Sequence, residues 1–132
     1  MINAIRMFNN NFKQAQSQSR QDMINQRYNE IYSHELAHQR AGGSLAGGIV
    51  IEKDANGIPI GGHVPIKMPT FSSSNPDKTI QEADTVIRSA MAPSDPSDQD
   101  FMVANQARMI KSKAENYKKH NPQVGQKLNV SV

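Results

Sequence analysis

The stretch that organises this fold is SHELAHQRAGG, at residues 33–43. It contains the pattern His-Glu-x-x-His, with His34, Glu35 and His38 at the spacing found in zinc hydrolases. On an α-helix, residues i and i+4 share one face, so both imidazoles can reach the same ion. Glu35 projects about 100° around the helix from His34, which places its carboxylate beside that ion. The pattern therefore predicts a helical zinc site in which Glu35 is the general base for a metal-bound water.

The helix that carries this motif is predicted over about residues 21–41. The segment has no Gly or Pro, and Ile24, Tyr28 and Ile31 recur at spacings of four and three, which is typical of one buried face. This apolar face leads directly into the motif. Two glycines follow, and a glycine just past the last turn is the usual stop of a helix.

A β-hairpin is predicted after the helix. Residues 48–52 are a β-branched run, residues 58–66 form the return segment, and Asn-Gly at 56–57 is a strong turn signal between them. The return segment contains two prolines, which cannot donate a hydrogen bond to a strand ladder. We therefore expect an edge strand or an irregular one.

Two further helices are predicted downstream, and both ends of the chain are polar. One helix opens with Asn-Pro-Asp at 75–77, and the other starts within Ser-Asp-Pro-Ser-Asp at 94–98. Residues 1–20 are rich in Asn and Gln, so we expect a flexible arm or a frayed helix there, and residues 120–132 are expected to be a loose tail. The predicted fold is α+β: a long HExxH helix, one hairpin and two more helices, forming a single zincin-like catalytic domain over 21–119.

Composition limits the class of protein. The chain has 132 residues, enough for one small domain, and 36% of them are hydrophobic, so a bound metal would add to a modest core. It has no Cys, so a transition metal must be held by His, Asp or Glu. No apolar run is long enough to span a bilayer, and the start is too polar for a signal peptide. We expect a cytoplasmic protein without a transmembrane segment.

The third metal ligand is an open question at this point. Zinc in hydrolases usually takes three protein ligands and leaves the fourth position to water. One large protease class has its third His ten residues after the first, but this chain has Ser44 there. His63 is the candidate, because the glycine pair before it permits a close approach of the hairpin to the helix. Glu52 and Glu82 are weaker alternatives.

Other polar residues have less specific interpretations. Tyr28, Tyr32 and Arg40 are candidates for stabilising an oxyanion, although packing or solvation explains each of them equally well. His120 is predicted to be a surface residue. Basic side chains crowd the C-terminal quarter, but this region has no stacking motif or zinc finger, so a solvated helix face is favoured and nucleic-acid binding is not expected.

Three linked motifs resemble those of the SprA-related family, a bacterial family classed as zinc metalloproteases from its HExxH helix. They are the stretch at 33–43, the hairpin segments DANG and IGGHV at 54–57 and 60–64, and AMAPSDPSDQD at 90–100. The family shows H-E-x-A-H with an A-G-G stop, a D-G or N-G turn, G-G-E-V, and A-L-A-P-x-x-P-S-x-Q-D. His63 stands where the family commonly has Glu, and both residue types can ligate zinc.

The sequence therefore favours a zinc-dependent metallopeptidase that acts on polypeptide substrates, with Zn²⁺ held by His34, His38 and His63 and with Glu35 as general base. The strand near residues 49–52 could receive a peptide by strand addition. The alternative is a non-catalytic, metal-stabilised protein-interaction module. A third and weaker alternative is an anion or nucleic-acid binder that uses the basic C-terminal helix.

Overall fold

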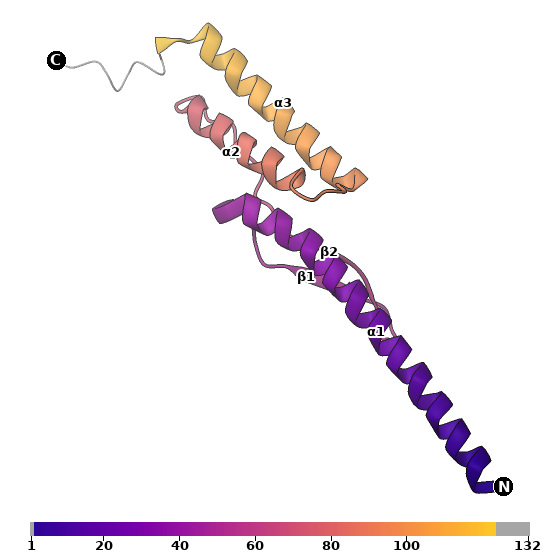
Figure 1. Cartoon of the computed structure of the whole chain (residues 1–132). Coiled ribbons are helices and arrows are strands. Elements are labelled where there is room, and N and C mark those ends of the chain that lie inside the picture. The colour runs from indigo at the N-terminus through magenta and orange to yellow at the C-terminus, as the bar shows by residue number, and fades with distance from the viewer. Residues whose placement is uncertain (1, 124–132) are drawn as a thin grey trace.

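The computed structural model describes residues 2–123 and confirms the α+β fold (Figure 1). A central helix, α2 (Pro76–Ala90), lies between α1 (Ile2–Gly42) and α3 (Asp98–His120). A two-stranded antiparallel sheet, β1 (Val50–Lys53) and β2 (Pro59–His63), packs beside α1. Among the helices described, none has the length and apolar character needed to cross a membrane. The last part of the predicted tail, residues 124–132, lies outside the described residues.

Helix α1 is 41 residues long and includes the segment that the sequence assigned to a flexible arm. No Gly or Pro interrupts the chain before Gly42, so nothing stops the helix at residue 20. The side chains of residues 3–20 are all exposed, and this half of α1 extends away from the rest of the molecule (Figure 1). At the other end the helix stops as expected, because Gly43 has a φ of +53°, a left-handed conformation that favours glycine.

The hairpin has the predicted turn. Gly57 has a φ of +77°, and Asp54 Oδ1 accepts hydrogen bonds from the backbone N–H groups of Asn56 and Ile58. The strands pair with Val50 opposite His63, and the register shifts once near the turn end of β1. An isolated bridge between Ala46 and Ile66 continues the pairing beyond the open end.

The core lies mainly between α2 and α3 and consists of small side chains. Its fully or almost fully buried hydrophobic residues are Ala83, Val86, Ala90, Ala104, Ala107 and Ala114. Small residues let the two helix backbones approach closely, but they bury little apolar area. The two helices begin where side chains cap them, with Asn75 accepting from the Lys78 N–H and Ser97 forming a capping box. The second cap matters for the site, because it orients an acidic side chain.

Candidate metal centre

The HExxH motif lies on one face of α1, close to its C-terminal end. The Nε2 atoms of His34 and His38 are 3.1 Å apart, and their rings meet edge to face. Glu35 is only 5% exposed. Ligand atoms of all three residues lie within 4.8 Å of one another, so this His–Glu–His group could hold a metal ion.

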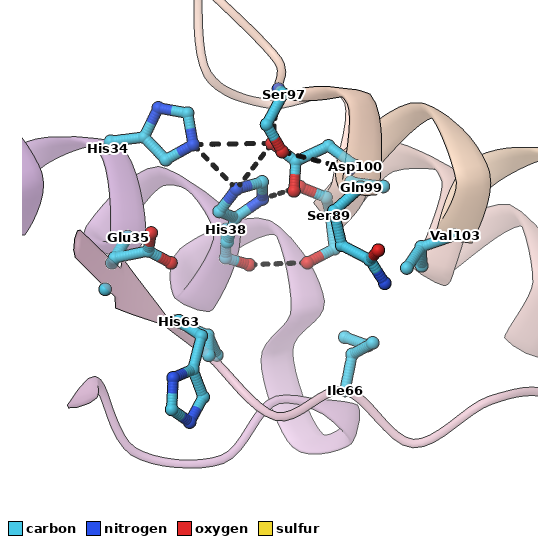
Figure 2. A pocket seen from close by; sticks show the side chains of 13 residues that line it. His34, Glu35, His38, His63, Ile66, Ser89, Ser97, Gln99, Asp100 and Val103 are labelled. Carbon is cyan, nitrogen blue, oxygen red and sulfur yellow. Dashed lines mark hydrogen bonds and ion pairs between the residues drawn. The ribbon is translucent and has the colours of Figure 1, made fainter. Parts of the chain in front are cut away.

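Asp100, which sequence reasoning missed, approaches both imidazoles from α3 (Figure 2). Its Oδ2 lies 3.3 Å from His34 Nε2 and 3.2 Å from His38 Nε2. The capping box holds this carboxylate in place: the Asp100 N–H donates to Ser97 Oγ, and the Ser97 N–H donates to Asp100 Oδ2 at 2.8 Å. The S-x-x-D motif at a helix start was a visible signal for that orientation. Nothing local in the sequence indicates that α1 would face it.

Hydrogen bonds on the other ring nitrogens orient the two imidazoles. His38 Nδ1 donates to the Ser89 carbonyl oxygen at 2.7 Å, and Ser89 Oγ in turn donates to the His38 carbonyl oxygen at 2.7 Å. His34 Nδ1 lies 3.4 Å from a carboxylate oxygen of Asp95. A carbonyl oxygen can only accept, so the contact with Ser89 places the proton of a neutral His38 imidazole on Nδ1. The Nε2 lone pair of His38 is then free for a metal, which is the arrangement that metal-binding histidines usually have. His34 has a carboxylate near each ring nitrogen, Asp95 at Nδ1 and Asp100 at Nε2, so a metal on Nε2 would leave the Nδ1 proton facing Asp95.

The spacing of the three converging atoms fits a tetrahedral metal. The two Nε2 atoms and Asp100 Oδ2 form a triangle with sides of 3.1, 3.2 and 3.3 Å. Ligands about 2.0–2.1 Å from zinc are about 3.3–3.4 Å apart in a tetrahedron. The nitrogen lone pairs and the carboxylate repel one another at this separation unless a proton or a metal cation lies among them. Both the distances and the chemistry of the donor set therefore fit a divalent ion.

Burial raises the pKa of Glu35 above its ordinary value. The negative charge of Asp100 acts in the same direction, whereas His38, His34 and His63 oppose it. Burial arises in part from β2, because a Cβ added to Gly62 would lie 2.9 Å from Glu35 Cγ. Gly62, the second glycine of the pair, thus allows the close approach of hairpin and helix that the sequence suggested.

The His34–Glu35–His38 group includes neither His63, the predicted third ligand, nor Asp100, but only Asp100 has an oxygen within 3.3 Å of both Nε2 atoms. Side chains on a strand alternate between its two faces, and the Cβ position of Gly62 faces α1, so the next side chain is directed to the other face. There His63 Nδ1 pairs with Glu52 Oε1 at 3.0 Å, and the side chain is 54% exposed. Figure 2 shows His63 below Glu35 and His38, on the opposite side of His38 from Asp100. The geometry therefore favours Asp100 over His63 for the third position.

The remaining candidates lie away from the centre. Tyr28 and Tyr32 stack on each other with ring centroids 6.0 Å apart, and neither lines the cavity beside the motif. Arg40 is exposed on α1, and Glu82 accepts a backbone hydrogen bond from the loop before α2. His120 is exposed at the last position of α3, as predicted for a surface residue.

A cavity of about 320 Å³ opens beside the histidines and Glu35. It is bounded by α1, by β2 and the segment that follows it, by the end of α2 and by the start of α3. Figure 2 shows His38 and Ser89 in the middle of this wall, with Glu35 and His63 towards one end and Ile66, Gln99 and Val103 towards the other. The candidate metal-binding group thus has access to a space in which a ligand can lie.

Comparison with known proteins identifies the family. The SprA-related family matches residues 3–126, almost the whole chain, and the protein therefore belongs to this family. No curated protein and no solved structure matches the chain.

Proposed function

We propose that this member of the SprA-related family is a zinc-dependent peptidase, with the metal held by His34, His38 and Asp100. The observation that carries the proposal is the convergence of the two Nε2 atoms and Asp100 Oδ2, within 3.1–3.3 Å of one another, next to the buried Glu35. Three protein ligands leave one coordination position open, as in catalytic rather than structural zinc sites.

Each residue of the centre has a distinct task. His34, His38 and Asp100 would bind the ion, which when bound polarises a carbonyl group and makes a coordinated water more acidic. Glu35 would take a proton on its carboxylate from the attacking water and deliver it to the leaving nitrogen of the peptide bond. Ser89 holds the His38 ring in the orientation that exposes Nε2. The walls of the cavity shield these groups from part of the solvent.

The test of catalysis compares Glu35→Gln with the unmodified protein on an unstructured polypeptide, with and without a chelator. Loss of the general base should lower turnover by about 10²–10⁴-fold while zinc binding persists. Glu115→Gln is the control, because that carboxylate lies on α3 about four helical turns beyond Asp100 and should leave both properties unchanged. Hydrolysis by Glu35→Gln at the unmodified rate would overturn the peptidase proposal.

The ligand set is tested by zinc titration of three variants. Asp100→Asn should weaken zinc binding by more than the 10–100-fold typical of an outer-shell residue, because it removes the charged ligand. His63→Ala should change it by less than about tenfold. Asp98→Asn, an exposed carboxylate in the same first turn of α3, controls for charge alone. If His63→Ala abolished binding and Asp100→Asn did not, the third ligand would be His63.

A non-catalytic interaction module is the second candidate. It is favoured by the exposed apolar side chains on the projecting half of α1, where Ile5, Phe8 and Phe12 are 57–70% exposed. These residues follow spacings of three and four and so lie along one side of the helix. Metal binding without hydrolysis, and with Glu35→Gln equivalent to the unmodified protein, would support this candidate.

A further inference from the structure

Two chemically different groups of residues line the cavity beside the candidate metal centre. One group is polar and includes the motif residues, His63 and Asp100. The other is aliphatic and comes from different elements: Val64 and Ile66 after β2, Ala90 at the end of α2, and Val103 on α3. Figure 2 shows Ile66 and Val103 on the side of the cavity away from Glu35 and His63, which we call the aliphatic end.

The aliphatic end offers no charged partner. No Lys or Arg is among the residues that line the cavity, and its carboxylates, Glu35 and Asp100, lie next to the two histidines. The Ser89 hydroxyl already donates to the His38 carbonyl oxygen. A charged side chain placed here would lose water without gaining an ion pair, which is unfavourable, whereas an aliphatic one would be removed from water with a gain in free energy.

The size of the cavity limits what can enter. Pockets for small molecules and cofactors usually have volumes of about 300–1,000 Å³. At about 320 Å³ for both ends together, this cavity is at the lower limit of that range. The aliphatic end is a part of it and therefore suits a single side chain rather than an extended ligand.

We propose that Val64, Ile66, Ala90 and Val103 form a specificity subsite that receives one aliphatic side chain, of about the size of leucine, from the residue next to the cleaved bond. This inference rests on the proposed function and names its substrate class: polypeptides with an aliphatic residue at the cleavage position. Gln99, which is exposed beside the subsite, is placed to contact the peptide backbone at its rim.

The subsite can be tested by ligand binding, without turnover. The probes are hydroxamates, which chelate zinc, each joined to one amino acid with the side chain of glycine, leucine, phenylalanine, aspartate or lysine. Calorimetry on the zinc-loaded protein should show the leucine probe binding at least about tenfold more tightly than the glycine probe, since one methylene in an apolar pocket is worth about 10–200-fold. The aspartate and lysine probes should bind no more tightly than glycine.

Two substitutions at Val103 should move this preference in opposite directions. Val103→Phe fills the subsite, so the leucine probe should lose its advantage while the glycine probe keeps its affinity. Val103→Ala enlarges the subsite and should shift the preference from leucine to the larger phenylalanine probe. Met102→Phe is the matched control, because Met102 is the neighbouring residue on α3, is 55% exposed and does not line the cavity.

The outcomes separate the inference from the proposed function. Equal affinity for the leucine and glycine probes would overturn the subsite and leave the metal centre intact. A preference for leucine without any polypeptide hydrolysis would overturn the peptidase activity and leave the subsite. Failure of the protein to take up zinc and to bind even the glycine probe would overturn both.

Discussion

Replacement of Gly62 by alanine is expected to disturb the contact between β2 and α1 that encloses Glu35. The added Cβ would lie 2.8 Å from Ile31 Cγ2, 2.9 Å from Glu35 Cγ and 3.0 Å from the Val50 carbonyl oxygen. All three distances are shorter than a normal contact between nonbonded carbon or oxygen atoms, so the strand or the helix must move. Gly62 is not among the glycines with positive φ, so its backbone conformation is open to alanine. The effect therefore reports on packing alone.

Gly61 provides a control one residue away on the same strand. The nearest atom to a Cβ added there is Glu52 Oε2 at 3.7 Å, an ordinary contact. Replacing a glycine by alanine at a compatible site stabilises a protein by about 0.4–1 kcal/mol, because the unfolded chain loses conformational freedom. Overpacking costs about 1–3 kcal/mol. Both variants gain the stabilisation that comes from the less flexible unfolded chain, and only Gly62→Ala is overpacked. Gly62→Ala should therefore be less stable than Gly61→Ala by about 1–3 kcal/mol.

Urea unfolding followed by the helical circular dichroism signal measures this difference. The midpoint should fall in Gly62→Ala with little change in the slope, which reports the surface exposed on unfolding. Polypeptide hydrolysis should fall more than zinc affinity does, because the clash is with Glu35 rather than with a ligand, and a displacement of about 1 Å can cost about 100-fold in rate. If Gly62→Ala were as stable and as active as Gly61→Ala, the close approach of β2 to Glu35 would be refuted.

Two further predictions concern the support of the site and the extent of the domain. Ser89→Ala removes the buried hydroxyl that donates to the His38 carbonyl oxygen but keeps the backbone carbonyl that accepts from His38 Nδ1. We therefore expect a loss of about 0.5–1.5 kcal/mol in unfolding free energy and less than about a tenfold change in zinc affinity. A loss of zinc binding in a stable variant would show that the hydroxyl, and not only the carbonyl, orients His38. Deletion of residues 2–20 should leave the midpoint of thermal unfolding and the zinc affinity unchanged, because the described side chains of this segment are all exposed. A clear drop in either quantity would show that this half of α1 supports the domain.

Local sequence signals were sufficient for most of the secondary structure. The stop of α1 depends on a left-handed glycine, Gly43, and the hairpin turn on another, Gly57, and both conformations follow from residue type. The HExxH spacing likewise places His34 and His38 on one face of any helix that contains them. At the polar start of α1, composition suggested a flexible arm or a frayed helix, and the structure continues the helix through it because nothing in the chain breaks it.

The candidate for the third metal ligand could be chosen only from the tertiary structure. The sequence placed His63 on the correct hairpin, next to glycines that do permit close packing, but the alternation of side chains along β2 puts Gly62 towards α1 and His63 towards Glu52. Asp100 lies 62 residues after His38 and reaches it only because α2 holds the start of α3 beside α1. A spacing within one helix is set by the helix repeat, whereas an approach between helices depends on how their faces pack, and no short stretch of sequence contains that information.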